Sequence, residues 1–175
     1  MAKTNIKPIF KRRRSKIHGW GVFATAPINK NKRIIDYDGE KITHKQSAVR
    51  EDRYLSRGHI WCFKINNFWV RDAAVGGNTA RFINHSCKPN CYVQIVGHTI
   101  WIRAARNIKR GEELSYDYST DGDKTMPCRC KPGCTTKLWS TVSISTVSRR
   151  PKSRRRRGGL PIGCSHTMWR CTVQI

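Results

Sequence analysis

Residues 80–90, Ala-Arg-Phe-Ile-Asn-His-Ser-Cys-Lys-Pro-Asn, include several side chains that could do chemistry. The amide of Asn84 and the imidazole of His85 offer hydrogen-bond donors and acceptors that could contact a polar ligand. Cys87 could be a metal ligand or a small buried apolar residue. Pro89 disfavours helix at the residue before it, so the stretch ends in an extended or turning backbone. A polar turn beside the core is the competing interpretation, because Asn, Ser and Pro are common in turns.

Three cysteines further along the chain, Cys128, Cys130 and Cys134, are close enough in sequence to bind one metal ion. Structural zinc takes four ligands in a tetrahedron, and thiolates are among its preferred ligands. The Lys-Pro-Gly segment between Cys130 and Cys134 can form a tight turn. An unmetallated cluster of reactive thiols is the alternative. No metal-type spacing surrounds Cys164 and Cys171, so we interpret them as free thiols.

The Gly19-Trp20-Gly21 triplet is another candidate for ligand contact. Its two glycines free the backbone to adopt positive φ angles, so that main-chain groups can approach a ligand closely. A tight turn is the ordinary interpretation of such a triplet. The triplet alone therefore leaves both interpretations open.

In their order along the chain, these and two other stretches resemble the motifs of SET-domain protein-lysine methyltransferases. The resemblance covers roughly residues 10–139. It rests on His-Gly-Trp-Gly-Val-Phe at 18–23, Asp-Tyr-Asp-Gly-Glu at 36–40, the stretch at 80–90, Gly-Glu-Glu-Leu-Ser-Tyr-Asp-Tyr at 111–118 and the cysteines at 128–134. A pre-SET region is missing. The resemblance is therefore to a minimal SET protein with a post-SET zinc segment, such as bacteria or viruses carry.

The resemblance implies S-adenosylmethionine as methyl donor and lysine side chains of a histone or other basic protein as acceptors, with mono- or dimethyllysine as product. It implies structural zinc at Cys87, Cys128, Cys130 and Cys134. The residues that it places against the cofactor are His18, Gly19, Trp20, Trp61, Asn84, His85 and Trp139. The residues that it makes catalytic are Tyr118, Tyr116 and Tyr37.

Each tyrosine has a separate role by this resemblance. Tyr118 falls beside the reacting methyl group, and Tyr37 falls in the lysine channel. Tyr116 falls where the family has Phe or Tyr, and its hydroxyl, with a water that it holds, would restrict higher methylation. Methyl transfer needs a neutral, well-aimed amine, and an aromatic channel disfavours the charged form of lysine. A core tyrosine is the alternative for Tyr118. Core packing is the alternative for Trp61 and Trp139, which would otherwise flank the adenine.

Short strands separated by turns must position these residues. Strands are predicted at 22–24, 33–37, 60–65, 68–70, 91–95 and 98–104, where β-branched and aromatic residues gather between turn residues. A helix is predicted within 42–55 and a short one at 80–83. The fold class is therefore mainly β with short helices. The resemblance adds small twisted sheets around a pseudoknot-like threading.

The predicted organisation is a flexible N-terminus at 1–10, a SET domain at 11–121, a post-SET zinc segment at 122–139 and a disordered basic tail at 140–175. The basic run at 11–14, Lys-Arg-Arg-Arg, is predicted to be a solvated, flexible arm. Contact between this arm and nucleic acid or an acidic peptide is the alternative.

The 175-residue chain carries a net charge of +24, from 35 Lys and Arg against 11 Asp and Glu. This excess favours a polyanionic partner, so nonspecific nucleic-acid binding through the arm and the tail is a candidate property. A catalytically silent SET module and a basic nucleic-acid-associated protein are the alternative functions. The sequence has no long apolar run and no secretory signal. We expect an intracellular monomer, cytoplasmic if bacterial and nuclear if eukaryotic, that acts on a protein or peptide lysine.

Overall fold

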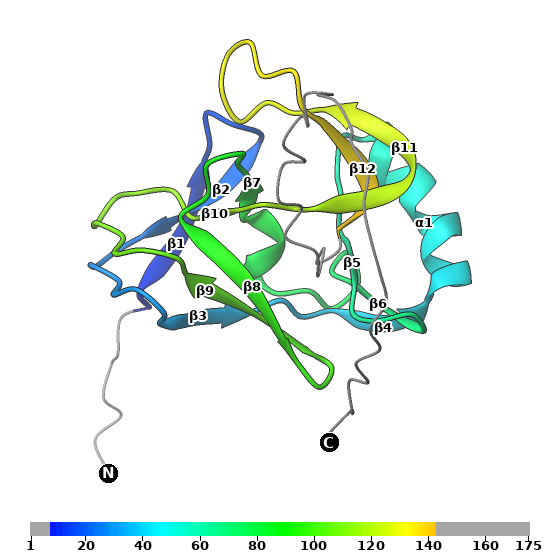
Figure 1. The fold of residues 1–175 in the computed structure, drawn as a ribbon, viewed down its shortest axis with the longest axis horizontal. Helices are drawn as coiled ribbons and strands as arrows, with labels where there is room; N and C mark the ends of the chain where they lie inside the picture. The colour runs from blue at the N-terminus through cyan, green and yellow to red at the C-terminus, as the bar shows by residue number, and fades with distance from the viewer. Residues whose placement is uncertain (1–7, 143–175) are drawn as a thin grey trace, which may run out of the picture.

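The computed structural model describes residues 8–142 (Figure 1), without the side chains of 121–123 and 140–142. The predicted flexible N-terminus up to residue 7 lies outside the described residues. The predicted basic tail from residue 143 onward, with Cys164 and Cys171, also lies outside them. Among the described residues, no helix has the length and apolar character that a membrane span needs.

The described residues form four small sheets that share one main core. The first is an antiparallel pair of β1 (Phe10–Arg14) and β2 (Trp20–Ala24). The second has the order β3 (Arg33–Asp36), β9 (Thr99–Ala104), β8 (Cys91–Val96). The third has the order β11 (Thr120–Pro127), β12 (Lys137–Val142), β5 (Cys62–Lys64), β6 (Trp69–Asp72), β4 (Glu40–Thr43). The fourth is a parallel pair of β7 (Asn84–His85) and β10 (Ser115–Tyr116).

These sheets confirm the predicted fold class, mainly β with short helices. Hairpins form as predicted, with β5 antiparallel to β6 and β8 antiparallel to β9. Along β9, Ile100 and Ile102 are fully buried and alternate with more exposed residues. Gly97 adopts a positive φ of 58° in the β8–β9 turn, where a side chain would be disfavoured.

Helix α1 (His44–Ser56) begins and ends with recognisable local signals. Thr43 and Gln46 form a capping box, in which each side chain accepts a hydrogen bond from the other residue's backbone N–H. The helix is tied to β6 by the fully buried carboxylate of Asp72. This carboxylate accepts hydrogen bonds from Arg50 (2.8 Å) and from the hydroxyl of Tyr54 (2.9 Å). The charge of Asp72 is thereby compensated within the fold.

The basic run at 11–14 is not the predicted flexible arm, because it forms most of β1. The strand pairs along its whole length with β2, from Phe10 opposite Ala24 to Arg14 opposite Trp20. Ile9 and Phe10 also pack against the main core. The charges at 11–14 obscured this pairing, which depends on backbone hydrogen bonds and on apolar residues that precede the run.

The parallel β7–β10 pair brings together the two chemically richest stretches of the chain. Asn84 lies opposite Ser115, and His85 lies opposite Tyr116. The two short strands are far apart in sequence, so only the tertiary fold can bring them together. This is where the resemblance predicts the pseudoknot-like threading.

Candidate active site

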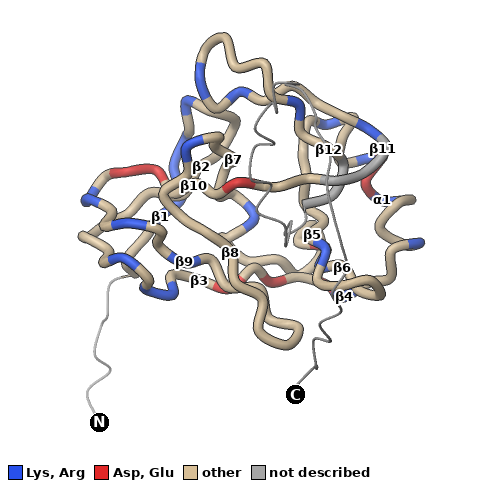
Figure 2. The backbone as a smooth tube through the Cα atoms, in the orientation of Figure 1, with Lys and Arg blue, Asp and Glu red and all other residues tan. Residues whose placement is uncertain are grey.

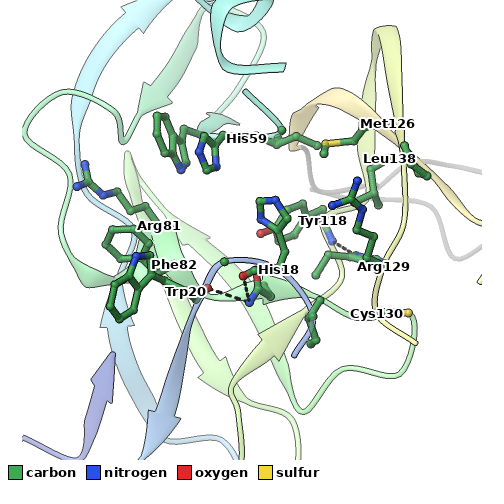
Figure 3. Close-up of a pocket in the computed structure, with 18 residues that line it drawn as sticks. His18, Trp20, His59, Arg81, Phe82, Tyr118, Met126, Arg129, Cys130 and Leu138 are labelled. Atoms are coloured by element: carbon green, nitrogen blue, oxygen red, sulfur yellow. Dashed lines mark hydrogen bonds between the residues drawn. The ribbon is translucent and has the colours of Figure 1, made fainter. Parts of the chain in front are cut away.

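A cavity of about 730 Å³, a volume that includes space open to solvent, lies where four segments of the chain converge with Tyr118 (Figure 3). Residues 17–20 precede and begin β2, and residues 58–61 follow α1. Residues 81–85 run from the 3-10 helix η1 (Thr79–Phe82) into β7, and the β11–β12 segment adds Met126, Arg129 and Leu138. Among the described residues that line the cavity there are two arginines, Arg81 and Arg129, and no Asp or Glu.

The Gly-Trp-Gly loop is held at the cavity by the side chain of Asn84. Its amide donates hydrogen bonds to the backbone carbonyls of His18 (3.3 Å) and Trp20 (3.0 Å) and to Oε1 of Glu113 (2.8 Å). Gly19 has a φ of 47°, in the left-handed region that favours glycine. A Cβ atom on Gly21 would collide with the Glu113 carboxylate. Gly19 therefore serves the backbone conformation of the loop, and Gly21 serves its close approach to Glu113.

His85 connects the cavity to the cysteine cluster. Its Nδ1 accepts a hydrogen bond from the backbone N–H of Tyr118 (3.2 Å), while its Nε2 lies 3.3 Å from Sγ of Cys87. This arrangement assigns the proton of the neutral ring to Nε2. Burial lowers the pKa of His85, and the nearby carboxylate of Asp117 opposes that shift only in part. The ring is therefore neutral at pH 7.

Tyr118 lies at the junction between the cavity and a cluster of buried aromatic rings. It lines the cavity, and its ring centroid is 4.8 Å from that of Tyr116. Tyr116 stacks on Phe63 at 6.2 Å, and Phe63 lies 5.3 Å from Tyr37. The hydroxyl of Tyr118 donates to the carbonyl of Ile83 (2.9 Å). Tyr118 therefore connects the ligand cavity to the three other rings of the cluster.

The three tyrosines remain neutral phenols at physiological pH. Burial raises the pKa of Tyr116 and Tyr37 well above the ordinary value, and it raises the pKa of Tyr118 as well. The hydroxyl of Tyr118 donates a hydrogen bond to the carbonyl of Ile83, and the hydroxyl of Tyr37 donates one to the carbonyl of Trp61 (2.9 Å). Each of these two oxygens thus keeps its lone pairs available as a hydrogen-bond acceptor.

A flat aromatic wall lies across the cavity from the Gly-Trp-Gly loop (Figure 3). His59 stacks on Trp61 with centroids 4.3 Å apart and ring planes 9° apart. His18 meets His59 edge-on at 5.7 Å. Burial is the main cause that lowers the pKa of both histidines, so both rings are neutral at pH 7. The wall therefore offers neutral π surface to a planar ligand group.

The four cysteines implied as zinc ligands lie together. The Sγ atoms of Cys87, Cys128, Cys130 and Cys134 are all within 4.8 Å of one another. Cys87 Sγ is 4.0 Å from Cys128 Sγ and 3.8 Å from Cys134 Sγ. A tetrahedron with Zn–S bonds of about 2.3 Å has sulfur atoms about 3.8 Å apart, so these distances fit zinc.

The three residues between Cys130 and Cys134 form a tight turn. Gly133 has a φ of 69°, and the backbone N–H of Cys134 donates to the carbonyl of Lys131 (3.3 Å). Hydrogen bonds from the hydroxyl and the backbone of Thr136 lower the pKa of the Cys134 thiol to about 6. The thiolate form that a metal requires is thus favoured at this position.

Comparison with protein families gives one match, which covers more than half of the chain. The SET domain family matches residues 19–119. The chain belongs to the SET-domain family. The matched region contains the Gly-Trp-Gly loop, the aromatic wall and the Tyr118 junction, and the cysteines of the β11–β12 segment follow it.

Several curated relatives are similar to this chain. The H3 lysine-4 specific histone-lysine N-methyltransferase of Emericella nidulans is 44% identical over 132 residues, which cover 69% of this chain and 11% of that protein. Trithorax of Drosophila virilis is 49% identical over 124 residues, covering 67% and 3% of the two chains. ATXR7 of Arabidopsis thaliana is 42% identical over 123 residues, covering 66% and 9%. The chain thus spans about a tenth or less of these relatives, all of which are named histone-lysine N-methyltransferases.

The SET-domain structure places most of the predicted cofactor residues around the cavity. Those that line it are His18, Gly19, Trp20, Trp61, Asn84 and His85. Trp139 does not line it and is 41% exposed, and its contact with the cofactor stays a prediction. Successive side chains of a strand point to opposite faces, so the buried Leu138 faces the cavity and Trp139 faces away. Tyr37 and Tyr116 lie behind Tyr118 in the aromatic cluster.

Several functional residues of the SET domain were missed by sequence reasoning. Glu113 receives hydrogen bonds from Asn84 and from the hydroxyl of Ser15 (3.0 Å), and so fastens the loop to the β10 segment. His59 and Arg129 line the cavity. No local pattern distinguishes Glu113 from an ordinary surface acid, because its partners come from two distant segments. Arg129 could have been suspected from its place between two predicted zinc ligands.

Proposed function

We propose that this SET domain transfers a methyl group from S-adenosylmethionine to the ε-amino group of a lysine in a protein. One observation carries the proposal: Tyr118 belongs both to the ligand cavity and to the buried tyrosine cluster. A methyl donor in the cavity and an amine held by the cluster could therefore meet at one hydroxyl. The presence of this tyrosine together with the Gly-Trp-Gly loop disfavours a catalytically silent module.

The residues of the cavity fit the donor's chemistry. Backbone groups of residues 18–20 are exposed by the positive φ of Gly19, and the His59–Trp61 stack offers a flat surface for an adenine. Arg129 supplies a cation for a carboxylate. When bound, S-adenosylmethionine supplies a methyl group on a positively charged sulfur. The absence of acidic residues from the described lining leaves aromatic faces as the surroundings for that charge.

The tyrosine cluster would prepare the acceptor lysine. An apolar, aromatic environment lowers the pKa of an amine because burial disfavours its charged form. The hydroxyl of Tyr118 donates its hydrogen bond to the carbonyl of Ile83, so its oxygen can still accept a hydrogen bond from the amine and orient it. Alignment of two bound reactants can supply about 7–11 kcal/mol of the barrier without a strong base. Positioning by these residues is therefore the main catalytic device that we assign.

The substrate is a histone or another basic protein, and the site of action is chromatin. The names of the relatives support this assignment, as does their origin in a fungus, an insect and a plant. We assign mono- or dimethyllysine as the product and structural zinc to the four cysteines. Their mutual distances support the zinc assignment.

Replacement of Tyr118 by Phe tests the catalytic assignment. Removing the hydroxyl should lower kcat by about 10²-fold or more, because the hydrogen bond that orients the amine is lost. The affinity for S-adenosylmethionine, measured by calorimetry, should change little. Tyr92→Phe is the matched control, because Tyr92 lies on β8 and does not line the cavity. Full turnover by the Tyr118 variant would remove Tyr118 from the reaction.

A further inference from the structure

Strand β1 presents unpaired positive charge along the edge of a two-stranded sheet. Lys11, Arg12, Arg13 and Arg14 are consecutive and exposed. None of them forms an ion pair with any of the residues that the structure describes. Their charges are therefore available to an outside partner.

All three arginines stack on aromatic rings, and two of them, Arg12 and Arg14, share the ring of Trp20. The guanidinium groups of Arg12 and Arg14 lie 4.6 Å and 4.4 Å from the centroid of the Trp20 ring, and Arg12 also lies 4.8 Å from Phe82. Arg12 and Arg14 are two residues apart on one strand, so they share a face. Stacking occupies the flat side of a guanidinium and leaves its edge N–H groups free to donate. This face is therefore ordered before any ligand arrives.

The surroundings reinforce the positive potential. Residues 8–142 contain 25 Lys and Arg against 11 Asp and Glu. Figure 2 shows Lys and Arg along β1 and in the loops that precede β3 and follow β9, on the same side of the molecule. The Ile28–Ile108 bridge brings these two loops together. The nearby carboxylate of Glu112 is already paired with Arg106 (2.7 Å).

We propose that the Arg12–Arg14 face of β1 binds the phosphate backbone of duplex DNA. Arg12 and Arg14 are about 6.6 Å apart along the strand, an interval that spans about two charges of one DNA strand. The guanidinium groups stack on the Trp20 ring, so a base would have to displace them to stack in their place. The face therefore contacts phosphates without base readout, which favours a duplex over a single strand.

Salt-dependent binding of the full chain to a short labelled duplex of mixed sequence tests this proposal. The double variant Arg12→Gln/Arg14→Gln should weaken binding by roughly tenfold and reduce the slope of log K against log salt by about 1.8, the value for two lost phosphate contacts. The matched control is Lys11→Gln/Arg13→Gln, which removes the same charge from the opposite face of the same strand. In the control, Arg13 also loses a ring contact, 4.5 Å from Phe23. The control should retain most of the affinity and slope.

A charge-preserving variant separates lost contacts from lost folding. Arg12→Lys/Arg14→Lys should keep the salt slope near that of the unchanged chain. Its affinity for the duplex should lie between those of the unchanged chain and of Arg12→Gln/Arg14→Gln. Equal losses from the two Gln variants would overturn the assignment to one face. An unchanged slope in Arg12→Gln/Arg14→Gln would overturn the proposal, as would a loss confined to a single-stranded probe of the same length.

Discussion

The hydroxyl of Tyr116 is the atom that we assign to product control. Tyr116 is 2% exposed, and its ring lies between Phe63 and Tyr118. A lysine that already carries a methyl group must rotate and place that group beside the new one. A phenol and a water bound to it would occupy that space, and displacing a well-held water loses its hydrogen bonds.

Tyr116→Phe should therefore permit higher methylation. We expect the unchanged enzyme to stop at mono- or dimethyllysine and the variant to form trimethyllysine with little loss of the first step. Mass spectrometry of the two enzymes' products on one peptide measures this directly. Predominant trimethyllysine from the unchanged enzyme would show that another channel residue, such as Tyr37, sets the limit.

Single residues were predictable where a motif marked them. Asn84, His85 and Tyr118 occur in dense polar or aromatic motifs, and the structure brings all three to the cavity. Glu113 was not predictable, because its role depends on hydrogen bonds from residues 29 and 98 positions away. Trp139 lies outside the lining of the cavity, because the one-residue alternation of a strand decides which face a side chain occupies.

At the scale of elements, the β11–β12 hairpin connects the cysteine cluster to the cavity. Cys128 and Cys130 flank Arg129, and Met126, Arg129 and Leu138 line the cavity. A metal held by the cysteines would therefore fix one wall of the ligand site. Without the metal, that wall would depend on the pairing of β11 with β12 and on the pairing of β12 with β5.

We expect one zinc per chain, and we expect chelation to loosen residues 127–139 and weaken cofactor binding. Elemental analysis measures the metal, and amide hydrogen exchange measures the loosening. Cys130→Ser should lose zinc, whereas Cys91→Ala should keep it, because Cys91 lies in the core outside the cluster. An active, rigid and metal-free protein would contradict the zinc assignment.

Elements with local signals were predicted, and those that depend on distant partners were not. Helix α1 and the β5–β6 and β8–β9 hairpins follow from capping residues, turns and alternation. β1 was misread because its charges outweighed any strand pattern, while its stability comes from β2 and the aromatic rings beside it. The parallel contact of β12 with β5 places Val142 opposite Phe63, beyond the predicted start of the tail at residue 140, and no local sequence pattern indicates it.

For the whole molecule, charge and proposed substrate must be considered together. The chain has a net charge of +24, and a histone or similar substrate is also basic. Long-range attraction therefore does not bring the two proteins together, whereas DNA has the opposite charge. The DNA-binding face that we infer on β1 would place the enzyme on chromatin, near its protein substrate. The family could be predicted from the order of the motifs. The place of the basic residues on the surface could not, because it depends on how the chain folds.

Methyl transfer itself is the central claim, and it can be measured on the full chain. Histones are incubated with S-adenosylmethionine that carries an isotopically labelled methyl group, and mass spectrometry locates the label. We predict label on the ε-nitrogen of lysine, and its near absence when Tyr118→Phe replaces the unchanged protein. A protein that binds S-adenosylmethionine yet labels no lysine in histones or other basic proteins would contradict the claim.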